Sequence, residues 1–244
     1  MVSSARSPAS RDLPLGKVLL MLLAVHAGLR WHQGLAVAPQ LEPLPAPPAL
    51  EALRVISLGD TPTLSRVLML WIHAQDTQPG LSIPFRELDY ARLTGWLKLC
   101  LALDPEAQAP LAAASRLYAQ VDDPVRSRQM LRLVDAAFAT DPARRWPWLV
   151  HAVHTARARL HDPTLALALA QHLSTNEDED LPDWVRLIEI HVLEEQGQIA
   201  QAARQLAALL ASGRLREAPS VEAATRYLQT LRSDAKTRKA PTPP

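Results

Sequence analysis

Asp-Pro dipeptides punctuate the middle of this chain at nearly regular intervals. They stand at residues 104–105, 123–124, 141–142 and 162–163, and a further proline stands at position 182. Aspartate can cap the first turn of a helix, and proline is tolerated at the first helical position, so each dipeptide can begin a helix. The intervals between these prolines, 18 to 21 residues, accommodate one helix and a short turn. The punctuation therefore predicts a series of short helices.

The apolar residues between these breaks follow helical periodicity. One complete set with the spacing i, i+3, i+4, i+7, i+8 is Leu64, Val67, Leu68, Trp71 and Ile72. No segment of comparable length alternates with period two, so the pattern requires no strands. We predict an all-α fold with helices at residues 49–58, 62–75, 88–103, 109–121, 124–139, 146–160, 163–173, 182–196, 198–212 and 219–232.

Taken in pairs, the predicted helices form longer units. Pro105 to Pro142 and Pro142 to Pro182 span 37 and 40 residues, a period typical of helical solenoids that bury a continuous core between stacked pairs. The pair at residues 182–213 resembles a tetratricopeptide repeat, on the basis of Trp184, Leu187, Gly197, Ala202, Ala203 and Leu206. This resemblance implies a right-handed α-solenoid of antiparallel helix pairs. In the first helix of the pair, we expect His191 to face inward beside Trp184, Leu187 and Ile188.

Three further stretches resemble an uncharacterised group of proteobacterial, membrane-anchored, tetratricopeptide-like proteins. They are residues 83–105, 113–124 and 141–152, within a resemblance that covers residues 49–215. It implies a location in the bacterial envelope and a helical repeat, and it implies no activity.

The amino terminus has the charge order of a secretory or membrane segment. Residues 1–17 carry Arg6, Arg11 and Lys17, and residues 18–29 are apolar apart from one histidine. A run of this length suits the core of a signal peptide, whereas extension to residue 33 gives a short membrane helix. We expect an uncleaved anchor at residues 18–33. A cleaved signal peptide and a cytosolic chain whose apolar start packs on itself are the alternatives.

This charge order predicts a single-pass protein of the cytoplasmic (inner) membrane with its carboxy-terminal domain in the periplasm. Residues 39–48 contain five prolines and favour a semi-rigid polyproline spacer. The basic tail lacks large apolar residues and is expected to be disordered. The predicted divisions are a basic terminus at 1–17, the anchor at 18–33, a Pro-rich linker at 34–48, a tetratricopeptide-like domain at 49–232 and a disordered tail at 233–244.

Composition excludes several classes of function. Lysine and arginine total 26 against 25 acidic residues, a net charge of +1, so the chain lacks the excess positive charge of nucleic-acid-binding proteins. Its single cysteine excludes a disulfide framework and a cysteine-based zinc site. Motifs for phosphate loops, dinucleotide binding and serine nucleophiles do not occur in the sequence. We therefore expect no enzyme, no cofactor and no bound metal.

The first candidate site for a partner is the irregular stretch at residues 76–90. It breaks the helical pattern with a Pro-Gly pair and a further proline, yet it retains large apolar residues. As a binding lip it would offer Arg86, Asp89 and Tyr90. Alternatively, the stretch folds back over the groove between helix pairs, and Arg86 and Asp89 pair locally.

The second candidate site lies at the predicted start of a helix. Arg144, Arg145, Trp146 and Trp148 combine the two residue types most enriched in interface hot spots. The alternative is that both tryptophans belong to the core.

These observations favour a non-enzymatic scaffold or adaptor that binds a protein or peptide partner in the envelope. Eight arginines between residues 116 and 159 suggest that the partner segment is acidic. An envelope protein or enzyme that handles polysaccharide or peptidoglycan is the alternative, and a purely structural spacer is a third. The sequence leaves the oligomeric state open.

Overall fold

The computed structural model describes residues 15–34, 43–78, 81–176 and 180–239. Its helices are α1 (Leu15–Gly34), α2 (Leu50–Ile56), α3 (Thr61–His73), α4 (Tyr90–Leu103), α5 (Ala109–Arg116), α6 (Pro124–Phe138), α7 (Pro142–Ala158), α8 (Pro163–Thr175), α9 (Asp183–Arg186), α10 (Ile188–Glu195), α11 (Ile199–Ala211) and α12 (Ala218–Lys239). Three 3₁₀ turns, at Ala74–Asp76, Phe85–Glu87 and Tyr118–Gln120, and the two-residue strands β1 (Thr77–Gln78) and β2 (Leu81–Ser82) complete the elements. The predicted all-helical fold is confirmed, with only this short β pair added.

Aspartate caps begin several of the helices, as the punctuation predicts. The carboxylate of Asp123 accepts hydrogen bonds from two amides in the first turn of α6, at 3.0 and 3.1 Å. Asp162 accepts one from Leu165 N at 3.0 Å and so caps α8. The dipeptide at residues 104–105 differs, because Asp104 accepts from Glu106 N within a turn and α5 starts only at Ala109.

Several helix boundaries differ from those expected: α5 ends at Arg116 instead of residue 121, and Leu187 divides the predicted helix 182–196 into α9 and α10. α7 begins at Pro142 instead of residue 146 and continues through Pro147, because the Asp-Pro start at residues 141–142 takes effect despite the later proline. α12 extends to Lys239, so residues 233–239, which were expected to be disordered, are helical. Residues 240–244 lie outside the described residues.

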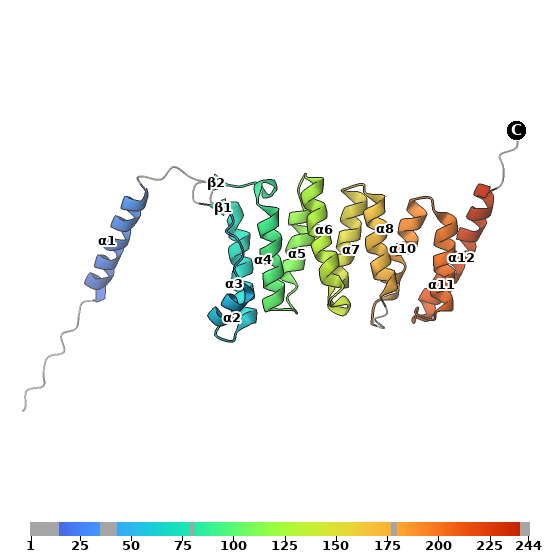
Figure 1. Cartoon of the computed structure of the whole chain (residues 1–244), viewed down its shortest axis with the longest axis horizontal. Coiled ribbons are helices and arrows are strands. Elements are labelled where there is room, and N and C mark those ends of the chain that lie inside the picture. The colour runs from blue at the N-terminus through green and yellow to red at the C-terminus, as the bar shows by residue number, and fades with distance from the viewer. Residues whose placement is uncertain (1–14, 35–42, 79–80, 177–179, 240–244) are drawn as a thin grey trace, which may run out of the picture. The chain divides into compact units, whose positions relative to one another are not determined.

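The helices from α3 to α12 lie side by side in chain order (Figure 1). Contacts between alternate helices divide them into two layers, because α4 contacts α6 and α5 contacts α7. Ion pairs continue this arrangement: Arg128 on α6 pairs with Asp162 at the start of α8 at 2.9 Å, and Arg157 on α7 pairs with Glu195 on α10 at 3.0 Å. We call α4, α6, α8 and α11 the first layer and α5, α7, α10 and α12 the second layer. Tyr227 on α12, whose hydroxyl donates to Glu194 on α10, joins the end of the second layer.

Two hydrophobic clusters fill the space between the layers. The larger runs from Leu44 to Val192 and includes the cores of α4 to α8. A smaller cluster, from Ile190 to Leu231, lies among α10, α11 and α12. Side chains of α8, such as Leu167, touch both clusters, so the core is nearly continuous along the stack.

Residues 43–49 pack along α4 and do not form a spacer. Leu44 is buried in the larger cluster, and its carbonyl oxygen accepts a hydrogen bond from Arg92 Nη1 at 2.7 Å. The indole of Trp96 donates to the carbonyl oxygen of Pro45 at 2.8 Å. The helical domain therefore begins at about residue 43, earlier than the predicted residue 49.

α1 is a separate helix of 20 residues. Its large apolar side chains between Val18 and Leu29 are exposed. Of the helices in the described part of the chain, none combines the length and apolar composition needed to cross a membrane. Residues 1–14 and 35–42, which hold parts of the predicted basic terminus and linker, lie outside the described residues.

Candidate binding pocket

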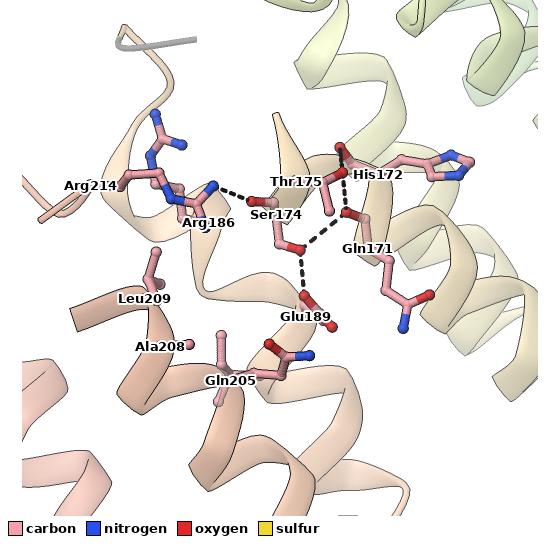
Figure 2. A pocket seen from close by; sticks show the side chains of 11 residues that line it. Gln171, His172, Ser174, Thr175, Arg186, Glu189, Gln205, Ala208, Leu209 and Arg214 are labelled. Atoms are coloured by element: carbon pink, nitrogen blue, oxygen red, sulfur yellow. Dashed lines mark hydrogen bonds between the residues drawn. The ribbon is translucent and has the colours of Figure 1, made fainter. Parts of the chain in front are cut away.

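A pocket of about 400 Å³ opens between α8, α10 and α11 (Figure 2). Its size lies within the range of about 300 to 1,000 Å³ that is usual for ligand sites. Polar and charged side chains from four helices and one loop surround it: Gln171, His172, Ser174, Thr175, Arg186, Glu189, Gln205 and Arg214. Consecutive helices of the stack thus bring together residues from a 44-residue stretch, 171–214, of the chain.

Glu189 is the carboxylate of this pocket. It is only 5% exposed, and the hydroxyl of Ser174 donates a hydrogen bond to its Oε2 atom. Within the residues that the structure describes, no lysine, arginine or histidine forms an ion pair with Glu189. A buried carboxylate in such a setting strongly favours an incoming donor or cation, because few other groups replace its lost hydration.

Two arginines at one end of the pocket donate hydrogen bonds to backbone carbonyl groups at the end of α8. Arg214 Nη1 donates to the carbonyl oxygen of Ser174 at 2.8 Å, and Arg186 Nη1 donates to that of Asn176 at 2.9 Å. Carbonyl groups at the end of a helix carry partial negative charge and lack intrahelical partners, so guanidinium groups stabilise them. These bonds direct both arginines toward the backbone after α8.

The remaining wall is apolar. Ile190 is 1% exposed and Leu209 is 4% exposed, and Ala208 lies between Leu209 and the mouth residue Gln205 along α11. At the rim, the side chain of Gln171 is half-buried and that of Gln205 is exposed. The pocket therefore offers an apolar side, a buried carboxylate and neutral hydrogen-bonding groups.

A second pocket, of about 310 Å³, lies between α4 and α6. Alanine and leucine side chains form most of its wall, with Lys98 and Arg145 among the lining residues. Both pockets border helices of the first layer: α4 and α6 flank the smaller one, and α8 and α11 flank the larger one, where α10 of the second layer contributes Glu189 and Ile190. A segment that follows this layer could place one side chain in each pocket.

The structure gives different positions to the four residues of the predicted 144–148 site. Arg144 is exposed and pairs with Glu106 and Asp141, each at 2.7 Å. Arg145 is 6% exposed and donates to the carbonyl oxygens of Ala137 and Pro105 and to the hydroxyl of Thr140. It therefore joins the turn after α6 to the turn after α4.

The two tryptophans of that site are half-buried against the larger cluster. Trp148 donates to Gln108 Oε1 at 2.5 Å. The rings of Trp146 and Trp184 form a T-shaped contact, with centroids 5.7 Å apart. Trp184 is 53% exposed. The exposed aromatic surface in this region is thus provided mainly by Trp184.

The predicted lip at residues 76–90 serves mainly to fix the start of α4. Asp89 caps that helix through two backbone amides and pairs with Arg92 at 3.2 Å. Tyr90 is buried, and its hydroxyl donates to the carbonyl oxygen of Tyr118 at 2.9 Å. Arg86 is exposed, so it retains access to solvent. Of the seven predicted site residues, Arg145 alone lines either of the two pockets just described.

The sequence analysis missed Glu189 because it assigned the wrong inward face to this helix. The expected inward residues Trp184 and His191 are exposed, and the buried face instead includes Val185, Glu189 and Val192. A break at Leu187 separates α9 from α10, yet the buried residues keep helical spacing across it. In the sequence, Glu189 stands at helical spacing between Val185 and Val192. This pattern could have indicated a buried carboxylate, but it is equally typical of a charge on the surface.

The described residues offer neither a cluster of metal ligands nor a thiolate nucleophile at Cys100. In the described part of the chain, no group of three or more His, Cys, Asp and Glu side chains could hold a metal ion. Burial raises the pKa of the Cys100 thiol to about 11, so at neutral pH this cysteine is protonated and weakly nucleophilic.

Comparison with known proteins gives no relative from which a function could be transferred. No protein-family model, no curated protein and no solved structure matches this chain.

Proposed function

We propose that this chain is a non-enzymatic scaffold of the bacterial envelope that binds an extended segment of a protein partner along its first layer. The two pockets that border first-layer helices carry this proposal. Stacked helix pairs present long surfaces, and such surfaces bind peptide segments through side-chain pockets. The proposed stack is a right-handed, tetratricopeptide-like solenoid.

A site-specific photocrosslinker tests this function. A benzophenone amino acid at Gln205, at the rim of the larger pocket, should give a discrete crosslinked product in cells. The same group at His154, an exposed residue on α7 of the second layer, is the matched control. Crosslinking at neither position, or equally at both, would contradict binding along the first layer.

We further propose that α1 attaches the protein to the cytoplasmic membrane and that the helical domain lies in the periplasm. The exposed apolar side chains between Val18 and Leu29 support attachment, because apolar surface of this extent is normally covered by lipid or protein. Lys17 precedes them, and basic residues favour the cytoplasmic side.

Cysteine labelling tests this location. Leu58 is 94% exposed, whereas the native Cys100 is fully buried, so Leu58→Cys adds one reactive thiol to a silent background. A membrane-impermeant maleimide should label it in cells whose outer membrane alone is permeabilised, and the protein should stay with the membrane in alkaline carbonate. Labelling only after lysis of the inner membrane would place the domain in the cytoplasm.

Polysaccharide binding is the second candidate function, and the exposed ring of Trp184 favours it. Aromatic faces at a surface can stack on sugars, and Trp184 is supported by Trp146 behind it. Peptidoglycan fragments should then change the tryptophan fluorescence of the protein, and Trp184→Ala should abolish the change. An unchanged fluorescence spectrum at millimolar glycan would contradict polysaccharide binding and favour protein binding.

A further inference from the structure

Glu189 is the carboxylate that lines the larger pocket. Its carboxylate is buried, and Ser174 is the residue of the described chain that donates a hydrogen bond to it. Charge-assisted hydrogen bonds are strong in such surroundings, because the local dielectric constant is low. A positively charged donor would therefore gain more here than at the protein surface.

The pocket also has the apolar wall that a basic side chain requires. Lysine and arginine bury their methylene groups on apolar surface while the charged end makes polar contacts. Ile190 and Leu209 supply the apolar surface, and the amide groups of Gln171 and Gln205 add neutral acceptors near the rim. An anionic side chain placed against Glu189 would be repelled by its carboxylate.

The nearby guanidinium groups leave room for this ligand. Arg186 and Arg214 donate to backbone carbonyl oxygens at the end of α8, and Figure 2 shows both on the side of Ser174 away from Gln205. The carboxylate of Glu189 lies between Ser174 and Gln205 in the same view. Positive charge in the pocket is therefore concentrated at one end, and negative charge lies at its centre.

We infer that the pocket between α8, α10 and α11 holds a lysine or arginine side chain of the bound segment, with its cationic group against the Glu189 carboxylate. This inference rests on the proposed function and names the residue class that the larger pocket selects. It also revises the expectation of a uniformly acidic partner, because at this position the segment is basic.

Selection from a synthetic random hexapeptide library on the immobilised full chain tests the inference. Wild-type protein should enrich peptides that carry lysine or arginine at one position. Glu189→Gln should lose that enrichment, because it removes the charge and keeps an oxygen that can accept the Ser174 bond. Glu195→Gln is the matched control on the same helix, since Glu195 lies outside the pocket and pairs with Arg157.

Each outcome of the selection separates the two proposals. Basic enrichment on the wild type and Glu195→Gln, but not on Glu189→Gln, supports the inference. Enriched peptides without a basic position, or with one that persists on Glu189→Gln, overturn it and leave peptide binding intact. Failure to enrich any peptide overturns both the inference and the proposed function.

Affinity measurements then test the charge itself. Replacement of the selected arginine by citrulline, or of a selected lysine by norleucine, should weaken binding to the wild type by about 10- to 100-fold, the usual range for a charge-assisted bond. The same replacement should change binding to Glu189→Gln by less than about threefold, the spread expected without that bond. An equal loss with both proteins would place the basic residue elsewhere on the surface. Unchanged thermal unfolding of Glu189→Gln verifies that the variant is folded.

Discussion

At the scale of single residues, burial separates side chains that the sequence presents as equivalent. Arg144 and Arg145 are adjacent, yet one is exposed between two carboxylates and the other is buried among carbonyl groups. A surface ion pair contributes little, whereas a buried donor that satisfies several acceptors is costly to remove. Arg145 is therefore a structural residue of the stack.

Replacement of Arg145 by methionine should destabilise the fold markedly. The substitution leaves the carbonyl oxygens of Ala137 and Pro105 without this donor, and we expect the free energy of unfolding to fall by about 3 kcal/mol. Arg144→Met, the matched control, should leave the urea midpoint nearly unchanged. Circular dichroism during urea unfolding measures both, and equal midpoints for the two variants would refute the structural role.

Stability should also decline in alkaline solution because of buried phenols. Burial raises the pKa of Tyr90 from 10.0 to about 12, and burial also raises the pKa of Tyr118. The unfolded chain loses these protons first, so their contribution is complete below pH 10 and decreases as the pH rises toward 12. For Tyr90 this loss amounts to about 2 kcal/mol.

Urea midpoints measured across this pH range provide the check. Tyr90→Phe has no phenol to ionise at this position, so its decline should be shallower than that of the wild type. Parallel curves for the two proteins would show that Tyr90 makes no contribution.

At the scale of elements, an Asp-Pro dipeptide is a start signal only where the next turn can form a helix. The dipeptides at residues 123–124, 141–142 and 162–163 each begin one, whereas residues 104–105 form a turn. Asp162 has a double role, because it caps α8 and pairs with Arg128 on α6. It thereby joins local helix formation to packing within the first layer.

Asp162→Ala should therefore cost more than Asp104→Ala. Loss of an aspartate cap usually destabilises a protein by about 0.5 to 2 kcal/mol, and Asp162 also loses its partner on α6. Asp104→Ala removes one 3.2 Å bond within a turn and should have a smaller effect. Thermal unfolding compares the two, and Arg128→Met separates the ion pair from the cap. A larger effect at residue 104 would contradict this assignment.

At the scale of the whole helical domain, stability is expected to vary along the stack. Each helix contacts its sequence neighbours, and proteins built in this way gain stability from the sum of neighbouring interfaces. The smaller cluster depends on α12, which contributes Ala224, Leu228 and Leu231. α12 thus covers the carboxy-terminal end of the core.

Truncation after Gly213 should loosen α10 and α11 and leave the centre of the domain folded. Hydrogen exchange followed by mass spectrometry should show faster exchange at residues 188–211, because the smaller cluster is opened to solvent. Exchange in α4 to α7 should stay close to that of the full chain. Uniformly faster exchange would instead show that the domain unfolds as one cooperative unit.

The sequence by itself determined the helices, because capping aspartates, prolines and apolar periodicity act within one or two turns of the chain. The turn at Gly197, with its positive φ of 74°, is local in the same sense. Tertiary structure alone decided that residues 43–49 pack on α4. Their prolines lack amide donors, and the carbonyl oxygens of Leu44 and Pro45 accept hydrogen bonds from Arg92 and Trp96, about fifty residues away.

The candidate pocket, too, depends on tertiary packing and not on local sequence. Its residues occupy four helices and the loop after α11. The stretch around Glu189 has no pattern that distinguishes a buried carboxylate from a solvated one. Glu189 is buried and Trp184 is exposed, on opposite faces of the segment formed by α9 and α10. Local sequence sets which residues are helical. The packing of α8 and α11 against α10 determines that Glu189 is the buried carboxylate. The binding chemistry of this protein therefore arises from contacts between helices.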